Sequence, residues 1–96
     1  MRVRSEFRSP WVAQYFSTMV KHFSEKIDVE RTDDTAKLTF VCGVADLALQ
    51  KGCLRMDITS PTNDELIQTC DVIERHLQRF AFREAPEPLV WEAAGE

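Results

Sequence analysis

The chain has 96 residues, of which 44% are hydrophobic and 29% charged, and its formal net charge is -4. This is the length and composition of one globular domain with one core, which excludes a disordered or fibrous protein. The negative balance argues against a nucleic-acid partner, because phosphate contacts need a concentrated basic face. No apolar run approaches the ~20 residues of a membrane span, and the N-terminus lacks the apolar core of a signal peptide. We therefore expect a cytoplasmic protein that binds neither a membrane nor nucleic acid.

Three cysteines, Cys42, Cys53 and Cys70, support the same compartment. Their number is odd, they form no C-x-x-C pair, and their spacing matches no zinc pattern. We expect three free thiols or small buried apolar residues, with no activating base beside any of them.

Residues 2–7 alternate between polar and apolar side chains, which predicts a short first strand. Ser9 then supplies an N-cap and Pro10 the first position of a helix that ends near Lys26. Large apolar residues recur along this helix at intervals of three and four, which predicts a broad buried face. They are Trp11, Val12, Tyr15, Phe16, Met19, Val20, Phe23 and Ile27.

The period of the pattern then changes to two, and we expect four strands joined by short polar turns. Their expected ranges are 27–30, 36–42, 44–49 and 53–59. Gly43 suggests a bulge or tight bend between the second and third of these strands. Gly52 supplies the positive φ that a hairpin turn needs before the fourth. The result is an antiparallel meander with one buried face.

A second helix is expected after residue 60, with either Ser60 or Thr62 as its N-cap. Thr62 is favoured because Thr62 and Glu65 have the spacing of a capping box. A narrow apolar stripe follows, made of Leu66, Cys70, Ile73, Leu77 and Phe80. Pro86 and Pro88 indicate an extended connection to a final strand at 89–91.

These elements predict an α+β two-layer sandwich in the order (β)-α-β-β-β-β-α-β. Two helices would pack on one face of a sheet of about four to six antiparallel strands. Residues 1–96 would form a single domain, with a core over 9–92 and a frayed tail over 93–96. We expect the outer face of the sheet to be polar or to carry a partner, and a homodimer is one such arrangement.

Three segments resemble a known bacterial family. Residues 76–84 read H-L-Q-R-F-A-F-R-E, residues 21–26 read K-H-F-S-E-K, and Phe40 is followed by Gly43. Together they resemble the family called domain of unknown function 2218, whose first helix carries K-H-F-x-H-K. The resemblance implies a small domain that occurs alone or at the C-terminus of siderophore-interacting flavin reductases. It implies an iron-siderophore context and such a reductase as partner, but no activity.

His22 and His76, the chain's two histidines, are the first candidate binding residues. With Glu25 they could form a three-ligand metal site with an open position, or a heme site. Glu25 stands where the family pattern has a second histidine, which would weaken a soft or heme-type ligand set. The alternative is that each ring packs at the edge of its helix and hydrogen-bonds to a neighbour.

Arg79, Arg83 and Glu84 form the second candidate set. Two arginines four residues apart could clamp a carboxylate or phosphate, including that of a flavin or siderophore. The alternative is that they cap the helix and form salt bridges to Glu87 or to the strand turns. Phe82 is expected to pack the helix end against the sheet.

The residues suggest three classes of function. The leading one is a non-catalytic auxiliary or binding module, because no catalytic residue set is evident and no cofactor is expected. The family resemblance implies its link to iron-siderophore uptake or reduction. A second is a small metal- or heme-binding protein that uses His22 and His76. A third is a small enzyme in which Arg79 orients an anionic substrate.

Overall fold

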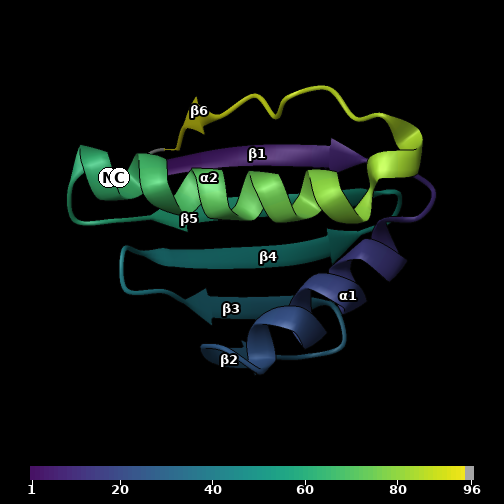
Figure 1. Ribbon diagram of the computed structural model, residues 1–96, viewed down its shortest axis with the longest axis horizontal. Helices are drawn as coiled ribbons and strands as arrows, with labels where there is room; N and C mark the ends of the chain where they lie inside the picture. Colours follow the sequence, from purple (N-terminus) through teal and green to yellow (C-terminus); the bar gives the residue numbers. More distant parts are fainter. Residues whose placement is uncertain (95–96) are drawn as a thin grey trace.

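In the computed structural model, which describes residues 1–94, six strands form one antiparallel sheet and two helices cover one face of it (Figure 1). The elements in chain order are β1 Arg2–Arg8, α1 Val12–Ser24, β2 Asp28–Arg31, β3 Thr35–Thr39, β4 Val44–Gln50, β5 Cys53–Thr59, α2 Asn63–Phe80, the 3-10 turn η1 Phe82–Glu84, and β6 Glu92–Ala93. This confirms the predicted α+β class and the predicted order of elements.

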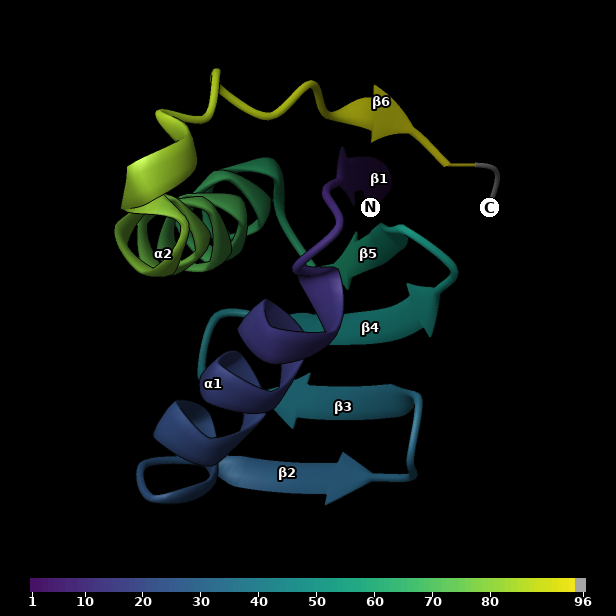
Figure 2. The ribbon, with the colours of Figure 1, turned by 90° about the vertical axis from the view of Figure 1, so that its right-hand side faces the viewer.

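The strands lie in the order β2-β3-β4-β5-β1-β6, and every neighbouring pair is antiparallel. Strands β2 to β5 form the expected meander. The first strand pairs with β5, and the last strand pairs with the far side of β1. Figure 2 shows β1 nearly end-on while β2 to β4 run across the view, with both helices to the left. None of the helices within residues 1–94 is long and apolar enough to cross a membrane.

The core lies between the sheet and the helices. Alternate residues of β5 point inward, and Leu54, Met56 and Ile58 are 0% exposed. Phe16 from α1 and Ile73 from α2 cover the same layer and are 1% and 0% exposed. Each such side chain contributes about 1.5–3 kcal/mol through the removal of apolar surface from water. This layer fixes the separation of the two helices and so the geometry between them.

Both predicted glycine turns are present. Gly52 has a φ of 68° in the turn between β4 and β5, which a side chain would strain. Gly43 accepts a hydrogen bond from the Phe40 amide at 2.8 Å and closes the turn between β3 and β4. An added Cβ at Gly43 would lie 2.1 Å from Ser60 Oγ, so this turn packs tightly against the segment that leads into α2.

Two predicted boundaries are wrong. Helix α1 begins at Val12, and Ser9 caps the preceding turn, where its Oγ accepts a hydrogen bond from the Trp11 amide at 3.1 Å. The last strand is Glu92–Ala93, so part of the expected tail pairs with β1. The strand predicted over residues 2–7 is present as β1, which lies between β5 and β6. The end of the expected tail, residues 95–96, lies outside the described residues.

Candidate ligand-binding site

The five side chains predicted to bind a ligand fall into two groups. His22, His76 and Arg79 lie where the C-terminal half of α1 meets α2, and the centres of the two imidazole rings are 5.0 Å apart. Arg83 and Glu84 lie beyond the end of α2, in the wall of a cleft. The structure therefore brings the histidines together but does not place all five residues in one site.

The histidines belong to an imidazole cluster made of His22, Phe23, His76 and Phe80. The ring of Phe23 lies 4.8 Å from that of His76 and meets the His22 ring edge-on at 5.1 Å. Phe80 flanks both imidazoles, at 5.7 Å from His22 and 6.3 Å from His76. Such spacings are typical of tilted and edge-to-face ring pairs. The cluster thus joins the two helices through packed rings.

The protonation of this cluster follows from its contacts. His76 Nδ1 lies 2.7 Å from the Val72 carbonyl oxygen. A carbonyl only accepts hydrogen bonds, so Nδ1 carries the proton and the neutral ring keeps its lone pair on Nε2. Burial lowers the pKa of His22, and its electrostatic interactions with His76, Lys26 and Arg79 lower it further. The neutral form of His22 is therefore favoured at pH 7.

The predicted three-ligand metal set is not assembled. Within residues 1–94, no group of three or more His, Cys, Asp and Glu side chains is placed to hold a metal ion. The charge of Glu25 raises the pKa of the His22 imidazole. Burial and the interactions with His76, Lys26 and Arg79 lower that pKa by more. It therefore does not complete a site with the two histidines, because it follows the C-terminal residue of α1 and is exposed.

A cleft of about 540 Å³ lies between the first turn of α1 and the end of α2. Its lining residues are Trp11, Gln14, Tyr15, Phe80, Phe82, Arg83 and Glu84, and we call it the aromatic cleft. Trp11 is 54% exposed and Phe82 is 66% exposed. The expectation that Phe82 packs against the sheet is wrong, because η1 turns this residue away from the core. Large exposed aromatic rings beside a hollow are typical of a binding surface.

Glu84 anchors the floor of the aromatic cleft. Ser9 Oγ lies 2.9 Å from each of its carboxylate oxygens, and the Tyr15 hydroxyl donates a hydrogen bond to Oε2. The hydrogen bond to Glu84, followed by burial and the negative charge of that carboxylate, raises the pKa of Tyr15. Ser9 and Tyr15 were not predicted as site residues, since they lie 75 and 69 positions from Glu84 in the sequence. Glu84 is therefore committed to the fold, and Arg83 is the charged group left for a ligand.

Arg83 is the exposed cation of the cleft. Its guanidinium carbon lies 5.8 Å from the centre of the Phe82 ring, and within residues 1–94 it forms no ion pair with a carboxylate. The expected salt bridge to Glu87 is absent from the described residues. An arginine beside an exposed ring can bind an anion and stack on an aromatic ligand at once.

A second carboxylate, Glu74 on α2, holds the extended segment before β6. Its Oε1 accepts from Trp91 Nε1 at 2.9 Å, and its Oε2 accepts from the Leu89 amide at 3.2 Å. Neighbouring Cys70 is partly buried, and burial and the charge of Glu74 raise its thiol pKa to about 11. Burial also raises the pKa of the Cys53 thiol. Both groups are thiols at neutral pH, as predicted for unreactive cysteines.

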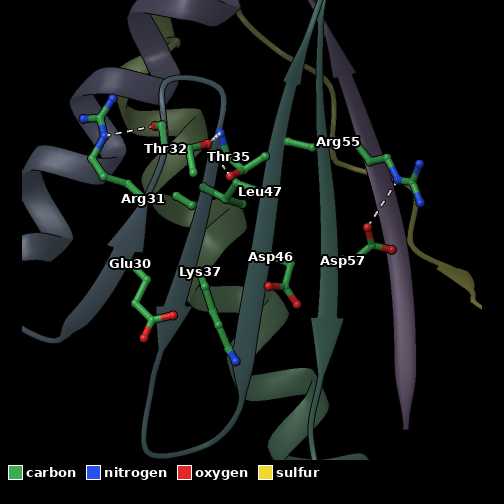
Figure 3. Close-up of a pocket in the computed structure, with 11 residues that line it drawn as sticks. Glu30, Arg31, Thr32, Thr35, Lys37, Asp46, Leu47, Arg55 and Asp57 are labelled. Carbon is green, nitrogen blue, oxygen red and sulfur yellow. Dashed lines mark hydrogen bonds and ion pairs between the residues drawn. The ribbon is translucent and has the colours of Figure 1, made fainter.

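The outer face of the sheet carries a shallower hollow of about 440 Å³, which Figure 3 shows with the helices behind the strands. A row of charged residues crosses the six strands here, namely Glu30, Lys37, Asp46, Asp57, Arg4 and Glu92. Asp57 accepts from Arg4 at 2.6 Å and from Arg55 at 3.2 Å. The expected polar outer face is confirmed. Because two arginines already neutralise Asp57, this hollow is a weaker candidate site than the aromatic cleft.

Six antiparallel strands with both helices on one face, and a cleft at the helix junction, define a small two-layer α+β domain. The chain belongs to the family DUF2218, described as an uncharacterized protein conserved in bacteria, whose profile matches residues 4–92. The NMR structure of PA4090 from Pseudomonas aeruginosa is similar, with a TM-score of 0.80 and 29% sequence identity. The similarity covers 99% of this chain and 98% of that chain. No curated protein matches the sequence.

Proposed function

We propose that the protein is a non-catalytic binding module whose ligand occupies the aromatic cleft. The observation that carries this proposal is the exposure of Trp11 and Phe82, at 54% and 66%, beside one cation, Arg83. Two such rings leave apolar surface in water unless something covers it. A flat aromatic molecule would cover both rings and exchange that water for stacking contacts.

The presence of Arg83 narrows the proposed class of ligand to aromatic anions. A guanidinium binds a carboxylate, catecholate or phosphate through paired hydrogen bonds, and its plane can also stack on a ring. A ferric catecholate siderophore has both properties, since its rings carry the negatively charged oxygens that hold the iron. The proposed ligand is therefore of this class, and the proposed partner is a siderophore-interacting reductase in the cytosol. The three free cysteines are compatible with that reducing compartment.

A binding role, rather than catalysis, is supported by the chemistry of the cleft. Tyr15 has a raised pKa and so keeps its proton at neutral pH, and its hydroxyl is already bonded to Glu84. A general base must hold a free lone pair near the operating pH. Neither Tyr15 nor the anchored Glu84 meets that requirement.

Titration of the protein with tris(catecholato)iron(III) tests the proposal. We expect saturable quenching of Trp11 fluorescence and heat of binding in calorimetry. Trp11→Phe should remove the quenching, whereas Trp91→Phe should keep it, because Trp91 is held by Glu74 away from the cleft. Arg83→Gln should weaken binding at least tenfold, since it removes a charge-assisted contact worth about 1.5–3 kcal/mol.

The matched control for charge is Arg75→Gln, which removes an exposed arginine that pairs with Asp71 on α2. Its binding should equal that of the wild type. Absence of binding would overturn the proposal, as would equal weakening by both arginine variants. Binding of flavin mononucleotide but not of the catecholate would contradict the siderophore link.

A further inference from the structure

We propose that His22 and His76 form a two-imidazole site for a borderline divalent transition-metal ion, such as Zn²⁺, Ni²⁺ or Cu²⁺. The site bridges α1 and α2 and is separate from the proposed ligand in the aromatic cleft. Two protein nitrogens would hold the ion, and water or a small anion would fill the remaining positions. Nitrogen ligands of this type suit these metals better than they suit Mg²⁺ or Ca²⁺.

The spacing of the rings fits shared coordination. With a Zn–N distance of about 2.1 Å and a ring centre about 1.2 Å further on, each ring centre lies about 3.3 Å from the metal. Two imidazoles at a tetrahedral angle would then have centres about 5.4 Å apart. The observed distance is 5.0 Å, with the ring planes inclined by 48°. The observed separation of the ring centres thus lies within about 0.4 Å of the value for two imidazoles on one ion.

Rings that merely pack together also adopt such distances, so the metal site needs a second supporting observation. The tautomer of His76 provides it. Its Nδ1–H is held by the Val72 carbonyl at 2.7 Å. Metal-bound histidines are typically fixed in this way, with one ring N–H donated to a carbonyl or carboxylate and the other nitrogen free for the metal. Here the bond is made within one turn of α2, so the free Nε2 is available without any rearrangement of the backbone.

The charged neighbours set the conditions for binding. Burial and the charges of His76, Lys26 and Arg79 all oppose protonation of His22, while Glu25 favours it. A neutral His22 keeps a lone pair for a metal at neutral pH. The flanking rings of Phe23 and Phe80 limit access of water from the core side. The two imidazole rings therefore lie in a partly dry setting.

Nitrogen-15 NMR of the two imidazoles, recorded during titration of the wild-type protein with Zn²⁺, tests the inference. The chain has two histidines, so each ring signal can be assigned by substitution. We expect one lone-pair nitrogen of each ring to shift together, with saturation at one ion per chain. His76 should keep the Nδ1–H tautomer throughout. Movement of one ring alone, or of neither, would overturn the site.

Calorimetry with Zn²⁺ gives the second measurement. His22→Gln and His76→Gln should each weaken binding at least tenfold. Glu25→Gln serves as the matched control, and it should bind Zn²⁺ within about twofold of the wild type because its carboxylate is not a ligand. Binding that survives both histidine substitutions but is lost in Cys42→Ser or Cys70→Ser would place the metal on the thiols and overturn the site. If a variant fails to fold, the NMR titration of the wild type still decides.

Discussion

At the scale of single residues, Glu84 decides the ionisation of Tyr15. We expect the Glu84→Gln variant to ionise Tyr15 at a lower pH than the wild type does. The substitution weakens the hydrogen bond from the phenol and removes the negative charge, although burial still opposes the phenolate. Tyr15 is the chain's one tyrosine, so the absorbance of phenolate in an alkaline titration reports this residue alone.

The raised pKa of Tyr15 determines how the free energy of unfolding changes with pH. A tyrosine that ionises above 10 in the folded state and near 10 in the unfolded state stabilises the fold fully below pH 10. That contribution is lost as pH rises through the folded pKa. The wild type should therefore lose more unfolding free energy above pH 10 than Glu84→Gln does. Glu87→Gln, at an exposed position three residues on, is the control; identical phenol titrations in the wild type and Glu84→Gln would refute the assignment.

The same residues show what the sequence could and could not predict about the site. Glu84 and the two histidines stand out because of residue type and position on a patterned helix. The partners of Glu84 do not, because Ser9 reads as a helix cap and Tyr15 as part of an apolar face. Contacts between residues about 70 positions apart depend on how the helices cross, which local patterns do not encode. The structure therefore divides the predicted five residues into three parts. Glu84 is an anchor, Arg83 is an exposed cation, and the two histidines lie in the ring cluster with Arg79 near them.

At the scale of elements, Gly43 sets how closely the turn between β3 and β4 approaches the start of α2. We expect Gly43→Ala to lower the free energy of unfolding by about 1–3 kcal/mol, because overpacking forces neighbouring atoms to move. The added Cβ would lie 2.1 Å from Ser60 Oγ and 2.7 Å from Thr69 Oγ1, which donates to the Glu65 carbonyl of α2. Urea unfolding measures the loss.

A second substitution separates this close contact from the backbone preference of glycine. Ser60→Ala in the Gly43→Ala background removes the nearest atom and should restore part of the lost stability. Recovery should be incomplete, because the Thr59 carbonyl oxygen remains 2.7 Å from the new Cβ. Gly52→Ala is the contrasting case, since its Cβ would meet nothing within 4 Å and its cost arises from the positive φ. Wild-type stability of Gly43→Ala would contradict the packing argument.

Element order was predictable because each signal is local. The capping pair at the start of α2 is one example: Thr62 Oγ1 accepts from the Glu65 amide at 3.2 Å, as the spacing indicated. Strand alternation in β5 and the glycine turns are others. The last strand was misplaced because β6 is two residues long and is defined by backbone pairing with β1. Nothing in the side chains of such a short segment distinguishes it from its neighbours.

At the scale of the whole molecule, two helices on one face of a sheet must meet each other as well as the sheet. They meet partly through imidazole rings, which can acquire charge, rather than through aliphatic side chains alone. Within residues 1–94, the outer face has no helix layer and carries the row of charged residues instead. The acid sensitivity of the fold should therefore originate in the helix layer.

We expect the metal-free protein to lose stability as pH falls below about 6.5, the unfolded pKa of histidine. The folded pKa of His22 is lowered, so the unfolded chain binds more protons in the window from 6.5 down to the folded value. One such group contributes at most about 1.4 kcal/mol per pH unit, and nothing above that window. Urea unfolding between pH 7.5 and pH 5, with a chelator present, measures the slope.

Two substitutions should change that slope in opposite directions. His22→Gln should flatten it, because the group that titrates is removed. Glu25→Gln should steepen it, since the lost carboxylate was the charge that raised the pKa of His22 against burial, His76, Lys26 and Arg79. If His22→Gln lost stability as steeply as the wild type, the acid response would lie elsewhere in the molecule. If His22→Gln and Glu25→Gln changed the slope in the same direction, control of the acid response by His22 would also be excluded. The first substitution removes the titrating ring and the second removes the charge that favours its protonation, so their effects must be opposite.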